Sequence, residues 1–279
     1  MKILVANVST APKNDPFIIE HLVPAFRENM KKVALPDTEL VFRFPEWGVE
    51  GLEGNFFHSI QALAEPLLFH MCKDAEAEGF DAVLITCFAD SFMEHLRQFI
   101  NIPVASIGES SYLLAAQLGK RFGVVTISEH NIYETQRKIE EYGLSHLCAG
   151  VVPTAEEPAE QPLALIDSRR CIEAFHDTAR QLIARGAEVV IPGCGLMTPG
   201  VRLARGCEAL YPGGVTQVDG AAVLDVLSAG VLDAEKLVRL KRAGSAWIAR
   251  NGWYAMPDQA ALASGRKCFP NPGITFWDI

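Results

Sequence analysis

Two cysteines occupy the same place in two similar segments of the sequence. Cys87 closes GFDAVLITC at residues 79–87, and Cys194 closes GAEVVIPGC at residues 186–194. In each segment a glycine is followed two residues later by an acid and then by an apolar, β-rich run that leads to the cysteine. A free thiol has a pKa near ~8.5 and can act as base, acid or nucleophile. The chain therefore builds a thiol-bearing strand end twice.

Paired thiols suit the inversion of a stereocentre next to a carbonyl group. That reaction needs a base on one face of the carbon and an acid on the other, and two opposed cysteines can supply both through a planar enolate. It requires no metal and no cofactor, and we expect none. A single cysteine more often only fills space in a core, but the matched positions of Cys87 and Cys194 favour a catalytic pair. We interpret the other five cysteines as residues that only pack: Cys72, Cys148, Cys171, Cys207 and Cys268.

Small and polar residues follow the predicted strand ends, where open parallel sheets bind ligands. Backbone N–H groups of such loops can hold an anion or a developing oxyanion. The same residue types also form ordinary turns, and aromatic side chains there can equally pack in the core. The predicted substrate-binding residues are Asn7, Ser9, Thr10, Phe88, Ala89, Thr126, Gly195 and Leu196.

Charge and motif content argue against several other functions. The formal net charge is −9, and basic residues form no stripe, which disfavours nucleic acid and anionic membranes as partners. The seven histidines have no metal-ligand spacing, PGCGLMTPG lacks the Gly-Lys-Ser/Thr of a phosphate loop, and no G-x-S-x-G motif is present. We expect a small-molecule substrate and no metal site. The sequence leaves open whether the protein forms a homo-oligomer.

The N-terminus predicts a strand and no targeting segment. In MKILVANVST the apolar run is broken by Asn7, so it is too short for a signal peptide. No run approaches the ~18 apolar residues of a membrane helix. We expect a cytoplasmic protein whose cysteines are reduced.

Strands and helices alternate along most of the chain. The predicted strands have near-continuous apolar runs, which indicates parallel sheets covered on both faces, an α/β fold. They lie at 2–8, 40–44, 81–86, 103–107, 122–127, 149–152, 187–192 and 214–218, and a helix is predicted at 220–229. Three of the early strands have counterparts in the same order later in the chain, which predicts two similar lobes with the active site in the cleft between them. We assign residues 1–112 and 220–250 to the first lobe, 113–219 to the second, and 251–279 to an irregular C-terminal tail.

These motifs resemble those of the aspartate/glutamate/hydantoin racemase superfamily, and within it the hydantoin racemase branch. ITCFAD at 85–90 and PGCGLM at 192–197 are similar to the two catalytic cysteine motifs of that branch. ILVANVST resembles the opening strand, although the family usually has Asn-Pro-Asn-Ser/Thr there, and WGVEG at 47–51 resembles a loop that ends in Ile-Glu-Gly. The similarity covers roughly residues 1–230.

The resemblance implies two pseudo-symmetric flavodoxin-like lobes and cofactor-independent proton transfer between Cys87 and Cys194. Phe88-Ala89 and Gly195-Leu196 replace the more polar pairs of amino-acid racemases, which suits a cyclic or bulky substrate. The predicted function is a racemase or epimerase of a 5-substituted hydantoin or a related cyclic amide. One alternative is a cysteine-dependent cis–trans isomerase or C–C lyase of small dicarboxylates, similar to maleate isomerase or arylmalonate decarboxylase. A non-catalytic two-lobe binding protein is a weaker one.

Overall fold

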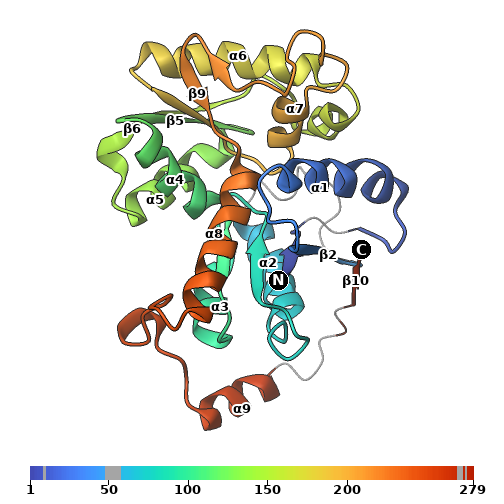
Figure 1. The fold of residues 1–279 in the computed structure, drawn as a ribbon, viewed down its shortest axis with the longest axis vertical. Coiled ribbons are helices and arrows are strands. Elements are labelled where there is room, and N and C mark those ends of the chain that lie inside the picture. The colour runs from blue at the N-terminus through green and yellow to red at the C-terminus, as the bar shows by residue number, and fades with distance from the viewer. Residues whose placement is uncertain (9–10, 48–57, 269–272, 274) are drawn as a thin grey trace.

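Two five-stranded sheets, each covered by helices, form the protein (Figure 1). The computed structural model describes residues 1–8, 11–47, 58–268, 273 and 275–279. The first sheet has the strand order β10-β2-β1-β3-β4 and the second the order β6-β5-β7-β9-β8. The α/β fold with two lobes that the sequence predicts is confirmed.

The first sheet is parallel except for its last strand. β1 (Lys2–Ala6) lies between β2 (Glu39–Pro45) and β3 (Ala82–Ile85), and β4 (Val104–Ser106) pairs with β3. All four residues of β3 are buried. Burial on both faces explains why these strands read as continuous apolar runs and not as alternating patterns.

The second sheet repeats this arrangement. β5 (Phe122–Thr126) lies between β6 (Cys148–Pro153) and β7 (Val189–Pro192), and β9 (Ala221–Val223) pairs in parallel with β7. β9 thus takes the place that β4 has in the first sheet. The cysteine-bearing strands β3 and β7 correspond to one another.

The last strand of this lobe differs from the sequence prediction. The sequence predicts a strand at 214–218 and a helix at 220–229, whereas Gln217–Val218 form the short β8, which turns back into β9. Asp219 and Gly220 make the turn with φ of +46° and +89°, the left-handed pair of a two-residue hairpin. The predicted boundary at residue 220 therefore falls before β9, which belongs to the second sheet.

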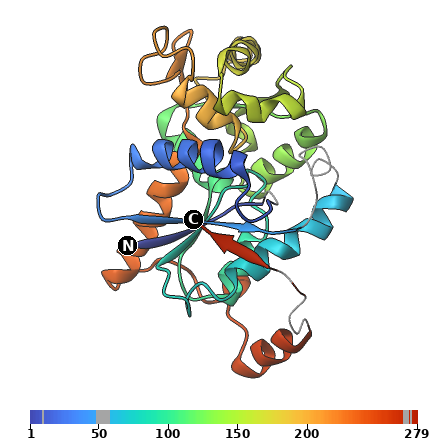
Figure 2. The same cartoon turned by 90° about the vertical axis from the view of Figure 1, so that its right-hand side faces the viewer.

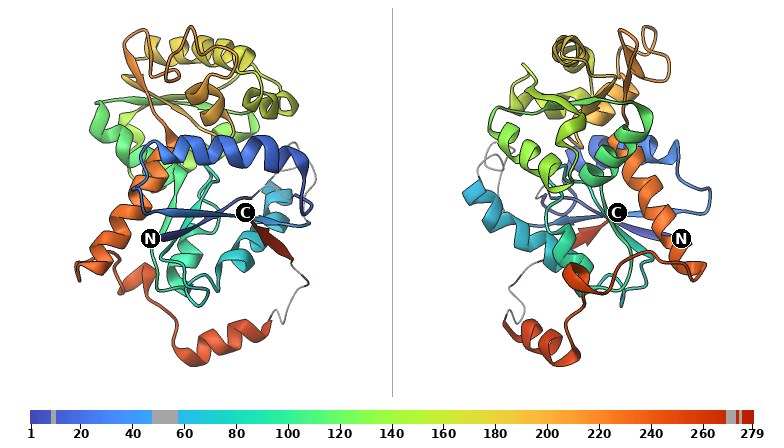
Figure 3. Two further views of the ribbon diagram at one scale, coloured as in Figure 1. Left: turned by 45° about the vertical axis from the view of Figure 1, so that its right-hand side comes forward. Right: turned by 90° about the vertical axis from the view of Figure 1, so that its left-hand side faces the viewer.

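Helices cover both sheets. The first lobe has α1 (Val23–Lys31) preceded by the π-helical η1 (Ile18–Leu22), α2 (His58–Cys72), α3 (Met93–Phe99) and α4 (Ile107–Leu118). The second has α5 (His130–Glu141), η3 (Ser145–Leu147), η4 (Pro158–Leu165), α6 (Arg169–Ala184) and α7 (Met197–Leu203). α8 (Val226–Arg242) leaves the second lobe and packs along the first, against α4 and β3 (Figure 1). α1 lies between the first sheet and the second lobe, where it contacts α7 (Figure 3).

The C-terminal tail returns to the first sheet. It contains η5 (Gly252–Tyr254), α9 (Gln259–Cys268) and β10 (Phe276–Asp278), which pairs antiparallel with β2 (Figure 2). Trp277 is buried against Phe44 at 5.3 Å between ring centroids. The tail, for which the sequence predicts irregular structure, therefore closes an edge of the sheet. Among the residues that the structure describes, no helix is long and apolar enough to cross a membrane.

Candidate active site

Cys87 and Cys194 each follow the carboxyl end of a central strand, β3 and β7 respectively, as the sequence predicts. The loops that carry them touch. A Cβ atom on Gly195 would lie only 2.9 Å from the carbonyl oxygen of Thr86. A Cβ atom on Gly193 would lie 3.2 Å from Cε1 of Phe88. The residues on both sides of Cys194 therefore pack against the residues on both sides of Cys87.

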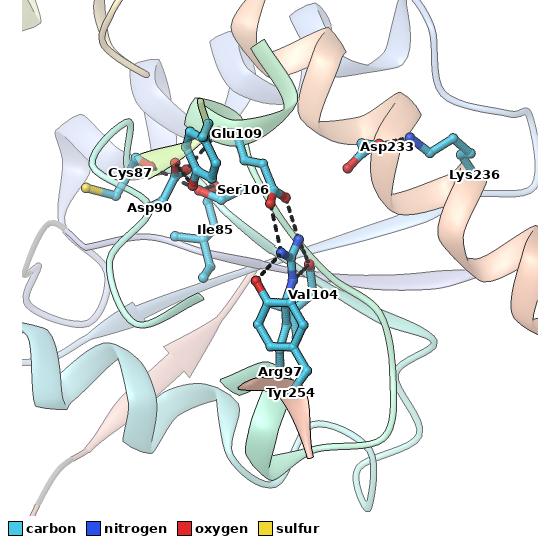
Figure 4. A network of polar contacts seen from close by, with 11 residues as sticks. Ile85, Cys87, Asp90, Arg97, Val104, Ser106, Glu109, Asp233, Lys236 and Tyr254 are labelled. Carbon is cyan, nitrogen blue, oxygen red and sulfur yellow. Dashed lines mark hydrogen bonds and ion pairs between the residues drawn. The ribbon is translucent and has the colours of Figure 1, made fainter. Parts of the chain in front are cut away.

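The Cys87 thiol is partly exposed, and its loop is held by several hydrogen bonds. The Ser91 hydroxyl donates to the Cys87 Sγ at 3.4 Å. The Cys87 carbonyl oxygen accepts from the Asp90 N–H at 3.2 Å and lies 3.2 Å from the Ser106 hydroxyl. In Figure 4 the sulfur points away from the network around Asp90 and Glu109. A hydroxyl donor at the sulfur stabilises the thiolate form.

Cys194 is also partly exposed but has a different environment. Burial raises the pKa of its thiol, and the nearby Glu156 carboxylate raises it further. Backbone N–H groups at the start of α7 oppose this, and that of Leu196 donates to the Cys194 Sγ at 3.3 Å. The net shift of the pKa is upward, which favours the thiol form of Cys194.

Glu156 is a site residue that sequence reasoning missed. It is only 6% exposed, and the Cys171 thiol donates a hydrogen bond to it. Burial raises the pKa of Glu156. Its neighbour Glu157 is exposed, and nothing in the run TAEEPAEQP distinguishes the two acids.

The residues predicted at the end of the first strand of each lobe, β1 and β5, lie close to the thiol loops. Asn7 is buried, and its Oδ1 accepts from the Thr86 hydroxyl at 2.9 Å, directly before Cys87. Thr126 is buried at the end of β5. Ser9 and Thr10 lie outside the described residues.

Two of the residues that follow the cysteines pack in the core. Phe88 is buried with its ring 5.2 Å from that of Tyr112, and Leu196 is buried in the same apolar cluster. Ala89 is partly exposed and Gly195 is buried.

Asp90 is a second residue that the sequence analysis did not select. Its carboxyl group is buried three residues after Cys87 and accepts from the Tyr142 phenol at 2.7 Å. Within the described ranges no group of three or more His, Cys, Asp or Glu side chains is placed to hold a metal ion. The two thiols are thus accompanied by the buried carboxyl groups of Asp90 and Glu156.

Comparison with known proteins agrees with this arrangement. Residues 20–230 match the profile of the Asp/Glu/Hydantoin racemase family. A hydantoin racemase from Pseudomonas sp. (strain NS671) is 28% identical over 215 residues, which are 75% of this chain and 78% of that protein. An allantoin racemase from Pseudomonas fluorescens, 28% identical, superposes with a TM-score of 0.70 over 92% of this chain and 97% of its own. One from Klebsiella pneumoniae, 22% identical, has a TM-score of 0.72 over 93% and 94%.

The matched region includes both thiol loops, the second sheet and strands β2, β3 and β4 of the first. The resemblance seen in the sequence motifs is confirmed. The chain belongs to the Asp/Glu/hydantoin racemase family and is an isomerase of the racemase type.

Proposed function

We propose that this protein is a cofactor-independent racemase in which Cys87 and Cys194 exchange a proton at the carbon α to a carbonyl group. The proposed substrate is a 5-substituted hydantoin or a related cyclic amide. The observation that carries the proposal is the packing of Gly195 against Thr86, which brings the two thiol-bearing loops together. The relatives named above support the substrate class, since allantoin is itself a 5-substituted hydantoin.

One thiolate removes the hydrogen at C5, and the electron pair of that C–H bond moves into the adjacent carbonyl to give a planar enolate. The opposite thiol then donates its proton to the other face of C5. The product is the enantiomer of the substrate, and the cysteines have exchanged protonation states. The total charge of site and substrate does not change.

The unequal environments favour one assignment of the roles for one enantiomer, and the roles are reversed for the other. Cys194 is the thiol that starts as the acid, because burial and Glu156 hold its proton. Cys87 is then the base, with the Ser91 hydroxyl donating to its thiolate. When Cys194 becomes the thiolate, the Leu196 N–H stabilises it. Substrate contacts by Ser9, Thr10, Ala89 and Thr126 are part of the proposal.

The test is proton NMR in D2O with single enantiomers of allantoin, 5-methylhydantoin and 5-benzylhydantoin, together with polarimetry. We expect the C5–H signal and the optical rotation to decay together, faster than without enzyme, and equally after dialysis against EDTA. Cys87→Ala and Cys194→Ala are expected to slow both by about 10²- to 10⁴-fold. Cys148→Ala is the matched control, because this partly exposed thiol lies at the amino end of β6. Full activity in either of the first two variants would contradict the two-thiol mechanism.

A further inference from the structure

The buried carboxyl group of Asp90 is bound from both lobes. Its Oδ1 accepts from the Glu109 N–H, in the first turn of α4, at 3.1 Å. Its Oδ2 accepts from the phenol of Tyr142, which follows the last residue of α5 in the second lobe, at 2.7 Å. Ser106 also hydrogen-bonds the carboxyl group, and its hydroxyl lies 3.2 Å from the Cys87 carbonyl oxygen. Figure 4 shows Asp90, Ser106 and Glu109 gathered on one side of Cys87.

The local backbone is shaped around this carboxyl group. Asp90 has a φ of +55° and Phe92 a φ of +54°, both left-handed, which side chains other than glycine adopt rarely. A Cβ on Gly108 would lie 2.5 Å from the Asp90 Oδ1 and 2.4 Å from the Phe88 carbonyl oxygen. Glycine at this position lets the start of α4 approach the Cys87 loop closely. The unusual backbone is held in place by contacts of the Asp90 side chain.

We propose that Asp90 is a positioning residue that sets the Cys87 thiol relative to the second lobe through its simultaneous bonds to α4 and Tyr142. The inference rests on the proposed two-thiol function. Cys194 belongs to the second lobe and Cys87 to the first, so proton transfer depends on how the lobes are held together. Misplacement of a reacting group by about 1 Å can cost about 10²-fold in rate. The Tyr142–Asp90 bond links the Cys87 loop directly to the lobe that carries Cys194.

The titration of Asp90 separates this role from a purely stabilising one. Burial raises its pKa to about 6, although the bonds from Ser106, Tyr142 and the Glu109 N–H act in the opposite direction. A carboxyl group with a raised folded-state pKa adds most stability below its unfolded pKa of ~3.9, and that contribution is lost as pH rises through the folded value. At neutral pH the ionised Asp90 therefore does not contribute to stability through its titration.

Among the described residues, no cation forms an ion pair with the Asp90 carboxylate. From α5 the facing group is Tyr142, whose pKa is raised by burial and by Asp90, so its phenol stays protonated and donates. From α4 the facing groups are Tyr112 and Glu109. Burial also raises the pKa of Tyr112. Glu109 pairs with Arg97 at 2.9 Å. A buried carboxylate that is hydrogen-bonded but not neutralised by a cation is an expensive way to hold a loop, which is why a positioning role explains it better than a stabilising one.

The experiment compares Asp90→Asn, Tyr142→Phe and the double variant with the unmodified protein. Tyr133→Phe is the matched control, because it removes a phenol that is 70% exposed on α5. We expect each single variant and the double variant to lower kcat by about tenfold with KM changed by less than about twofold, since the residues act as one unit. Asp90→Asn should leave the Tm at neutral pH equal or higher. In a plot of kcat against pH, the fall on the acid side should steepen below about pH 6 in the unmodified protein and not in Asp90→Asn.

A second measurement needs no substrate. Alkylation by iodoacetamide, followed peptide by peptide in a mass spectrometer, should change in rate at Cys87 in Tyr142→Phe and stay unchanged at Cys194. Unchanged kcat and unchanged Cys87 alkylation in both single variants would overturn the proposal, as would losses that multiply in the double variant. If Cys87→Ala retained racemisation while Tyr142→Phe still altered Cys87 alkylation, the two-thiol function would fail and the positioning of Cys87 would stand.

Discussion

Replacing Gly195 with alanine would insert a methyl group between the two thiol loops. Its Cβ would lie 2.9 Å from the Thr86 carbonyl oxygen, whereas ordinary contacts begin at 3.4 Å, so the loops must separate by about 0.5 Å. Gly195 is not left-handed, so the effect is steric alone. The Thr86 N–H is bonded to the Ala6 carbonyl oxygen at 3.1 Å, which fixes its position in the sheet. The displacement therefore falls on the Cys194 loop and widens the gap between the thiols.

We expect Gly195→Ala to lower the free energy of unfolding by about 1–3 kcal/mol, the usual range for overpacking. We expect kcat for racemisation to fall by roughly tenfold, since a 1 Å misplacement costs about 10²-fold. The control is Gly200→Ala, whose Cβ would lie 2.8 Å from the Ala164 Cβ, within the second lobe. Polarimetry gives kcat and thermal unfolding gives stability. The reasoning is refuted if both variants lose similar stability and Gly195→Ala keeps its kcat within twofold.

Three further predictions concern the thiols and the tail. Cys87→Ala and Cys194→Ala should each reduce racemisation by about 10²- to 10⁴-fold with an unchanged far-UV circular dichroism spectrum. Glu156→Gln removes the carboxylate that raises the pKa of Cys194, so iodoacetamide should alkylate Cys194 faster at neutral pH, and an equal or slower rate would contradict this. Arg43→Met leaves the part-exposed carboxylates of Glu78 and Asp278 without their buried cation and should cost about 2 kcal/mol in urea unfolding. A loss close to zero would show that this contact does not fasten the tail.

The sequence predicts the central strands well because of how they are buried. β1, β3, β5 and β7 are covered on both faces, so each leaves an uninterrupted apolar run whose end is visible in the sequence. The residue after such a run lies at the carboxyl edge of the sheet, and this is why the sequence alone places Cys87 and Cys194 there. Chain order then pairs β3 with β7 as corresponding strands.

The parts that the sequence did not predict depend on contacts between distant segments or on a missed turn. Asp219-Gly220 carries the signal of a two-residue hairpin, but the apolar residues after it also fit a helix, so their pattern alone predicts the wrong element. Glu156 and Glu157 are adjacent and chemically alike, and only the surrounding fold buries one of them. β10 is three residues long, and its place is fixed by the bond between Asp278 and Arg43, far apart in the chain.

The repeated strand supplies equal positions for the two thiols, but a two-base reaction needs unequal protonation. Two identical, interacting thiols would lose their protons in two separate steps and share one proton equally between those steps. Here the two sheets place the thiols at corresponding positions, and the surrounding loops give each thiol different neighbours. Ser91 donates to the sulfur of Cys87, and Glu156 places a carboxylate near Cys194. On the proposed mechanism these neighbours, which lie outside the repeated strands, decide which thiol holds the shared proton before substrate binds, while the two enantiomers use the thiols in opposite orders.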